Sequence, residues 1–337
     1  MMLWEILLVK GAGALAVLIA FAGTAFLLRF LYGPKGKFRE AAWDEVSGVD
    51  RLRVAPHSGF EGEEALRAAF LEYAGTFFSG ESRDDAPLRL KADHSFRVLR
   101  YAEEIAGQED AFADAGMARA LRLAALFHDV GRFEQFRRFR TFADEFSCNH
   151  ALLGAGILRE RKFLADEARK TRGLVLAAVA AHNRFSVPKN LSGSVGPVLF
   201  GLRDADKLDI MRIMADNLAP GERGDGTVLL HLRDEPERCS PLVFRALREG
   251  RTALYRDMRY VNDFRILLCS WLYDLHFPAA YRIVRREGHL HSVIDGCDAL
   301  PELQNDLRVF VDAFLSKGRA GSAITLNCSE EKVDVQA

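Results

Sequence analysis

The amino-acid sequence predicts an all-α protein with an N-terminal transmembrane helix. Apolar residues recur at helical spacing through most of the chain after residue 61. Strand signals are sparse, because the sequence has neither sustained apolar–polar alternation nor an Asn-Gly hairpin turn. A continuous apolar segment lies close to the N-terminus. These three observations predict a helical bundle attached to a membrane.

Composition is that of a globular protein with a large core. The chain has 337 residues, of which 49% are hydrophobic and 28% are charged. Its net charge is -1, from 46 basic and 47 acidic residues, so no overall field favours nucleic acid. The five cysteines form no CxxC pair, which argues against a disulfide framework and a zinc knuckle. Nothing in the sequence specifies an oligomeric state.

The apolar segment covers residues 11–28, where every residue is apolar, Gly or Thr. As a helix it would be about 27 Å long, close to a bilayer core of about 30 Å. A signal peptide and a buried core helix are the alternatives, but a signal h-region is shorter and no clear cleavage site follows. The basic residues lie mainly after the segment, at Arg29, Lys35, Lys37 and Arg39, with Lys10 before it. We therefore expect a single-pass anchor over residues 1–33 with the remaining chain in the cytoplasm.

Residues 34–60 are expected to be a juxtamembrane linker, and residues 61–317 a single helical domain. Its first helix starts near Glu61 and places Leu66 and Phe70 on one face. Residues 79–87 are polar and predict a loop, and the next helix opens at residues 93–102.

Further helices are predicted over residues 118–128, 149–158, 173–182 and 198–215, and Gly131 is expected to stop the first of them. Residues 241–315 keep the helical period and are interpreted as an extension of the same domain. Residues 318–337 are polar and are expected to form a disordered tail.

Six residues along these helices have the side chains that bind divalent transition metals. They are His94, His128, Asp129, His150, His182 and Asp206. The steps between successive positions in this series, counting the adjacent His128-Asp129 pair as one, are 22 to 34 residues, about one helix plus a loop. We therefore expect each position on a different helix, near its end, and all of them directed into one cleft of the bundle.

Asp129 is the natural bridging ligand, because it adjoins another ligand and its carboxylate has two oxygens. Two metals about 3.5–4 Å apart would activate a water and clamp a phosphate. The six residues therefore predict a hydrolytic metal site.

The series resembles the HD-domain superfamily of metal-dependent phosphohydrolases. That family has a His on one helix, a His-Asp pair on the next and an Asp on a later helix, which His94, His128-Asp129 and Asp206 match. The segment Ala205-Asp206-Lys207-Leu208 is similar to the closing Ala-Asp-x-Leu segment of the family. His150 and His182 resemble the additional histidines of two-metal members.

The resemblance implies an HD-domain-type helical bundle, and a first metal held by His94, His128, Asp129 and Asp206. Asp129, His150 and His182 would hold a second metal. One or two divalent ions are expected, drawn from Mn, Fe, Mg, Co and Ni. The expected substrate is a small phosphomonoester or phosphodiester, with a nucleotide as the first candidate.

One branch of the family is disfavoured. The HD-GYP phosphodiesterases carry a Gly-Tyr-Pro segment after a His pair, whereas Asn183 and residues 185–190 follow His182 here. This departure argues against a cyclic-di-GMP substrate and leaves the second metal open.

A basic, Phe-rich segment follows the His-Asp pair. Its arginines are Arg132, Arg137, Arg138 and Arg140, and they alternate with phenylalanines. An amphipathic helix with its phenylalanines in the core explains most of them. Arg132 is the exception, because family members often have a basic residue three places after the motif Asp, and we expect it to bind phosphate and support catalysis. Lys207 is expected to bind substrate and stabilise developing charge, and Arg184 is a weaker substrate-binding candidate.

The remaining His and Asp residues near these motifs have simpler explanations. An exposed helix face or an ion pair accounts for Asp204 and Asp209 better than metal binding does. Structural roles are expected for His57, His231, His276, His289 and His291.

Two other functions stay open. Some HD-fold proteins with similar ligands are di-iron oxygenases. A non-catalytic nucleotide sensor is the third possibility, although such a protein would be expected to have lost ligands, and all six are present.

Overall fold

The structure is a computed structural model that describes residues 62–187, 193–218 and 232–317. Apart from an isolated bridge between Arg233 and Tyr260, these residues contain no β-structure, which confirms the all-α prediction for them. None of their helices is both long enough and apolar enough to cross a membrane. The predicted anchor, linker and tail lie outside the described residues, as do His57 and His231.

The first group of helices comprises α3 (Glu63–Gly75), α4 (Ser82–Gln108), α5 (Ala115–Phe127), α6 (Gly131–Phe139), α7 (His150–Glu160), α8 (Arg169–Ala181) and α9 (Val195–Asn217). The second group comprises α10 (Pro241–Arg248), α11 (Val261–Ser270), α12 (Pro278–Glu287), α13 (His289–Asp295) and α14 (Pro301–Lys317). Short 3-10 helices connect some of them: η1 (Asp110–Phe112), η2 (Asp144–Phe146), η3 (Tyr255–Asp257) and η4 (Trp271–Asp274).

Helices α4, α5, α8 and α9 form the centre of the first group. α4 packs on α5 and α9, while α8 packs on α5 and α9 from the other side. α7 lies on α8, and α6 lies on α7. α3 covers α4 and α5 through the buried ring of Phe70, which meets Phe96 of α4 at 5.6 Å and Phe127 of α5 at 5.9 Å, both edge to face.

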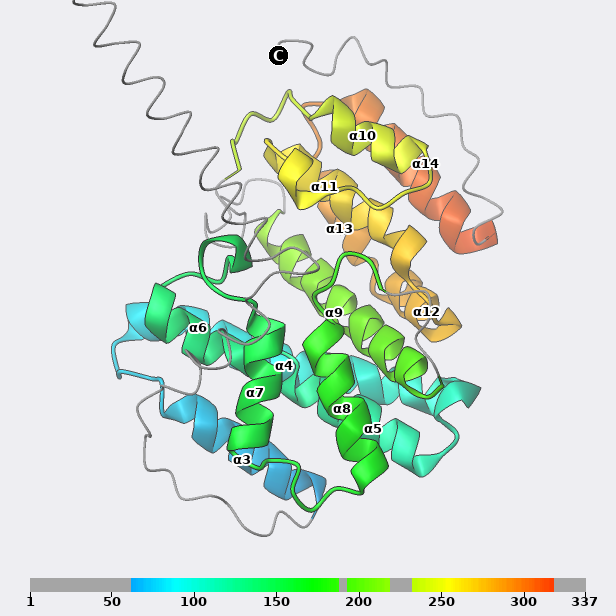
Figure 1. Cartoon of the computed structure of the whole chain (residues 1–337). Helices are drawn as coiled ribbons and strands as arrows, with labels where there is room; N and C mark the ends of the chain where they lie inside the picture. Colours follow the sequence, from blue (N-terminus) through cyan, green and yellow to red (C-terminus); the bar gives the residue numbers. More distant parts are fainter. Residues whose placement is uncertain (1–61, 188–192, 219–231, 318–337) are drawn as a thin grey trace, which may run out of the picture. The chain divides into compact units, whose positions relative to one another are not determined.

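Helix α9 belongs to both groups of helices (Figure 1). Besides α4, α5 and α8, it contacts α12 and α13 of the second group. Because α9 has neighbours on several sides, its sequence has no continuous polar face. Even its charged residues Arg203, Asp204 and Asp209 are buried.

Side-chain caps begin two of the helices that carry the candidate ligands. The Asp114 carboxylate accepts from the Met117 backbone N–H at the start of α5. The Asn149 side chain accepts from the Ala151 and Leu152 N–H groups at the start of α7. These caps satisfy backbone donors that the first helical turn leaves unpaired, and so they set where each helix begins.

Two sequence predictions about helix boundaries are wrong. The loop expected over residues 79–87 is shorter, because α4 already begins at Ser82 and contains Pro87 in its second turn. The Asp85 carboxylate accepts from the Ser79 and Gly80 N–H groups and holds the chain where it enters α4.

Gly131 does not stop a helix but begins α6, and a Cβ atom there would lie 2.7 Å from the Gly154 nitrogen. Its lack of a side chain lets α6 approach α7 closely.

Candidate metal centre

The six predicted ligands converge on one place in the first group of helices. His128 and His182 directly follow α5 and α8, Asp129 lies in the turn between α5 and α6, and His150 begins α7. His94 and Asp206 lie in the middle of α4 and α9, so the prediction that every ligand is near a helix end is wrong for these two. Both helices run through the centre of the bundle, which is why their middle turns reach the site.

The four histidines form two facing pairs. The Nε2 atoms of His94 and His128 are 3.2 Å apart, and those of His150 and His182 are 3.1 Å apart. An Asp206 oxygen lies 3.1 Å from Nε2 of His94 and 3.7 Å from Nε2 of His128, which completes one cluster. All four histidines are buried.

Asp129 lies between the two pairs with one oxygen toward each. Its Oδ2 is 3.8 Å from His94 Nε2 and 3.6 Å from His128 Nε2. Its Oδ1 is 3.3 Å from His150 Nε2 and 3.8 Å from His182 Nε2. A carboxylate placed in this way could bridge two ions, as the sequence predicts.

Each of the four candidate ligand histidines uses its Nδ1 for a hydrogen bond to the surrounding protein. His94 Nδ1 lies 2.7 Å from Asp209, and His150 Nδ1 lies 2.7 Å from Asp144. The backbone oxygens of Ala125 and Val179 accept from Nδ1 of the other two histidines, His128 and His182, at 2.8 and 2.7 Å. Because these oxygens accept, Nδ1 carries the proton, and in a neutral ring Nε2 is then a free electron-pair donor.

Divalent metals fit this arrangement. Two Nε2 atoms that both present lone pairs cannot hydrogen-bond to each other, yet they face each other at both pairs. A cation between such donors removes the repulsion, and His and Asp are suitable ligands for divalent transition metals. The clusters of His94, His128 and Asp206, and of His128, Asp129 and His182, are each compact enough to hold one ion.

Burial and charge favour the neutral form of two of the histidines and the ionised form of Asp129. For His94, burial opposes protonation, but the hydrogen bonds to Asp206 and Asp209 raise its pKa. Burial lowers the pKa of His128 to about 4, and burial together with Arg132 lowers the pKa of His150 to about 3. Burial opposes ionisation of Asp129, but Lys91, His128 and Arg132 together hold its pKa well below the usual value. Asp129 is therefore a carboxylate at neutral pH.

Asp209 and Asp204 do not lie on an exposed helix face, and both are fully buried. Asp209 accepts from Arg97 Nε at 2.7 Å as well as from His94, so it orients a predicted ligand. Asp204 accepts from the backbone N–H groups of His276 and Phe277 and ties α9 to the second group of helices. The ion-pair alternative is confirmed for Asp209, whose role at the site the sequence did not reveal.

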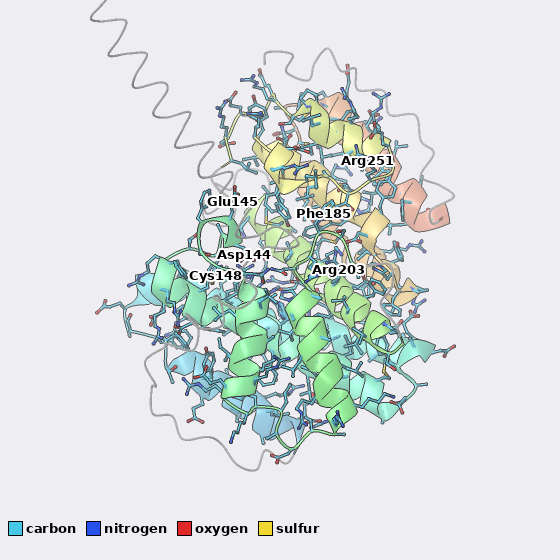
Figure 2. The ribbon with its side chains drawn as sticks, viewed as in Figure 1. Asp144, Glu145, Cys148, Phe185, Arg203 and Arg251 are labelled. Carbon is cyan, nitrogen blue, oxygen red and sulfur yellow. The ribbon has the colours of Figure 1, made fainter. Side chains whose placement is uncertain are left out.

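Asp144 is a second residue of the site that sequence reasoning missed. Its carboxylate accepts from Arg132 Nη1 at 3.0 Å, from Gln135 Nε2 at 2.9 Å and from Asn183 Nδ2 at 2.9 Å, in addition to His150. Figure 2 shows it in the segment that precedes α7. Its six-residue distance from His150 in the sequence follows no helical spacing, so no sequence signal indicated the contact.

Two cations lie against Asp129. The Lys91 ammonium donates to Oδ2 at 2.8 Å, and Arg132 Nε lies 3.4 Å from Oδ1. Arg132 is therefore beside the site, as predicted, although its phosphate contact stays a prediction. Lys91 was missed, but its three-residue spacing from His94 places both on one face of α4 and was a usable signal.

The other predicted substrate contacts are placed differently. Lys207 Nζ lies 2.7 Å from Asp274 Oδ2 in the second group of helices, and its expected role in catalysis stays a prediction. The Arg184 side chain is exposed just after His182, and its backbone oxygen accepts from Arg203. Arg137 and Arg138 pair with Glu134 on α6, in line with the amphipathic alternative.

Among the histidines expected to be structural, the three that the structure describes each contact a carboxylate. The contacts are His276 with Asp204, His289 with Glu287 and His291 with Asp312.

Comparison with protein families identifies the region that holds the site. Residues 92–219 match the HD domain, and this range includes all six candidate ligands. No curated protein and no solved structure matches the chain. Residues 92–219 are therefore an HD domain, a member of the HD-domain superfamily that the His and Asp series of the sequence indicated.

Proposed function

We propose that the protein is a metal-dependent phosphohydrolase. The observation that carries this proposal is the arrangement of the four histidines. They form two pairs, the Nε2 atoms face each other within each pair, and the Asp129 carboxylate lies between the pairs. His94, His128, Asp129 and Asp206 would hold one divalent ion, and Asp129, His150 and His182 a second. Ions held there would supply Lewis acidity for transfer of a phosphoryl group to water.

The chain's own residues have separate tasks in this proposal. Asp144 and Asp209 fix the rings of His150 and His94. Arg132 presents a guanidinium beside Asp129, where it would bind phosphoryl oxygens and offset their growing charge. The substrate is a small phosphorylated molecule with a nucleotide as the first candidate. The missing Gly-Tyr-Pro segment supports the exclusion of cyclic-di-GMP.

A screen of the full-length chain in detergent tests the proposal. Phosphorylated metabolites are offered with Mn, Fe, Co, Ni or Mg added back, and phosphate release is measured. Asp129→Ala should lower the rate more than about 100-fold, since the variant removes a ligand of both ions. Retention of full activity by this variant would show the metal mechanism to be wrong.

Thermal unfolding provides a readout that does not need the substrate. Metal at 100 times its dissociation constant stabilises the folded chain by about 2.7 kcal/mol, so Mn²⁺ should raise the melting temperature. The rise should be absent from Asp129→Ala.

The same donors also suit iron, and a di-iron oxygenase remains the alternative enzyme. Oxygen uptake by the iron-loaded protein, without phosphate release, would favour it. Tight nucleotide binding without turnover would favour a sensor.

We further propose that residues 1–33 anchor the chain in a membrane with the HD domain in the cytoplasm. The apolar segment 11–28 and the basic residues after it support this proposal. The chain should stay in the membrane fraction after carbonate extraction, and its release would refute the anchor.

A further inference from the structure

Lys91 contacts the same oxygen of Asp129 that faces the His94 and His128 pair. Its Nζ donates to Asp129 Oδ2 at 2.8 Å, and the same oxygen lies 3.8 and 3.6 Å from Nε2 of His94 and His128. Lys91 precedes His94 by one helical turn on α4 and lies just outside the region that matches the HD domain.

Arg132 has the corresponding position on the other side of the carboxylate. Its Nε is 3.4 Å from Asp129 Oδ1, the oxygen that faces His150 and His182. The two cations also share an aromatic neighbour. Lys91 Nζ is 5.6 Å and Arg132 Cζ is 5.9 Å from the ring centre of Phe142.

Both cations are more exposed than the carboxylate that they contact. The Asp129 side chain is 4% exposed, whereas those of Lys91 and Arg132 are 20% and 16% exposed. An anion that approaches Asp129 from solvent therefore comes within reach of both.

An ion bound at Asp129 would change what the Lys91 ammonium can contact. Charges of like sign repel at this range, and a divalent ion repels an ammonium group more strongly than a monovalent one does. The ammonium then needs another anion. Lys91 and the ion compete for Oδ2, so removing the lysine charge should favour the ion.

We propose that Lys91 and Arg132 form a two-cation receptor for the substrate phosphoryl group, and that this receptor selects phosphomonoesters over phosphodiesters. The inference rests on the proposed phosphohydrolase function. A phosphomonoester carries close to two negative charges at neutral pH, since its second pKa is about 6, whereas a diester carries one. Only the monoester brings one negative charge for each of the two cations.

The first experiment measures binding to the full-length chain in detergent and needs no turnover. Lys91→Met should bind Mn²⁺ several-fold more tightly than the unsubstituted chain. The Mn²⁺-loaded variant should bind inorganic phosphate about 10-fold more weakly, the value of one charge-assisted hydrogen bond. Lys170→Met, the same change at an exposed lysine of α8, is the matched control and should alter neither affinity.

The second experiment compares p-nitrophenyl phosphate with bis(p-nitrophenyl) phosphate. The unsubstituted chain should have the higher kcat/KM for the monoester. Lys91→Met should reduce that preference about 10-fold, mainly through KM for the monoester, and Lys91→Arg should largely restore it.

The outcomes separate the two proposals. If Lys91→Met lowers the Mn²⁺ and phosphate affinities together, the lysine only supports the fold of the site and the receptor is refuted. An unchanged monoester preference, or a preference for the diester in the unsubstituted chain, also refutes it. If neither ester is cleaved, the phosphohydrolase proposal loses support, while opposite shifts of the two affinities would still uphold the receptor.

Discussion

At the scale of single residues, Asp144 supports two predicted residues of the candidate site. Its carboxylate accepts from a predicted ligand, His150, and from the candidate phosphate contact, Arg132. Burial opposes its ionisation, but the bond from His150 and the charges around it lower its pKa to about 2. It is therefore an anion at neutral pH and needs all of its donors.

Asp144→Asn should weaken the second metal position more than the first. The amide NH₂ group must face one of the donors, so the His150 ring loses its fixed orientation. We expect metal affinity at that position to fall about 10- to 100-fold, measured by elemental analysis after dialysis against limiting Mn²⁺. Glu145→Gln removes a charge from the adjacent, exposed position and is the control. Unchanged metal content in Asp144→Asn would contradict the role given to Asp144.

At the scale of helices, the close approach of α6 and α7 sets the position of His150. A Cβ atom on Gly131 would lie 2.7 Å from the Gly154 nitrogen and closer still to the backbone oxygen of His150. The short turn from Asp129 into α6 and the start of α7 therefore depend on one residue without a side chain.

Gly131→Ala should destabilise the protein and disturb the site. The added methyl group must push α6 and α7 apart, which costs about 1–3 kcal/mol as overpacking. The free energy of unfolding in urea and the Mn²⁺ affinity should both fall. Gly173→Ala on α8, where a Cβ atom meets nothing within 4 Å, should be neutral or stabilising by up to about 1 kcal/mol. Equal stabilities for the two variants would exclude this account.

At the scale of the whole described molecule, Asp274 joins the HD domain to the C-terminal helices. Its Oδ2 accepts from Arg203 Nη2 at 2.8 Å and from Lys207 Nζ at 2.7 Å, and both cations are buried on α9. Arg203 also donates to the backbone oxygen of His182, so this junction reaches a predicted metal ligand.

Asp274→Asn should lower the free energy of unfolding by about 1–3 kcal/mol, because two buried cations lose their counter-charge. The 31% exposure of Asp274 admits solvent screening and keeps the loss below that of a fully buried pair. Asp216→Asn breaks an exposed ion pair on the same helix and should cost less than about 0.5 kcal/mol. A loss no larger than that of the control would show that Asp274 does not secure the junction.

The sequence by itself determined the all-α class and the convergence of the six candidate ligands, because helical period and ligand chemistry are properties of residue type and spacing. The resemblance to the HD-domain superfamily also placed Arg132 beside the site. Only the tertiary structure decided which carboxylates hold the histidine rings, namely Asp144 and Asp209. These contacts depend on which helix faces meet and how closely they approach. That approach is set by packing between residues far apart in the chain, as at Asp209 on α9 and His94 on α4.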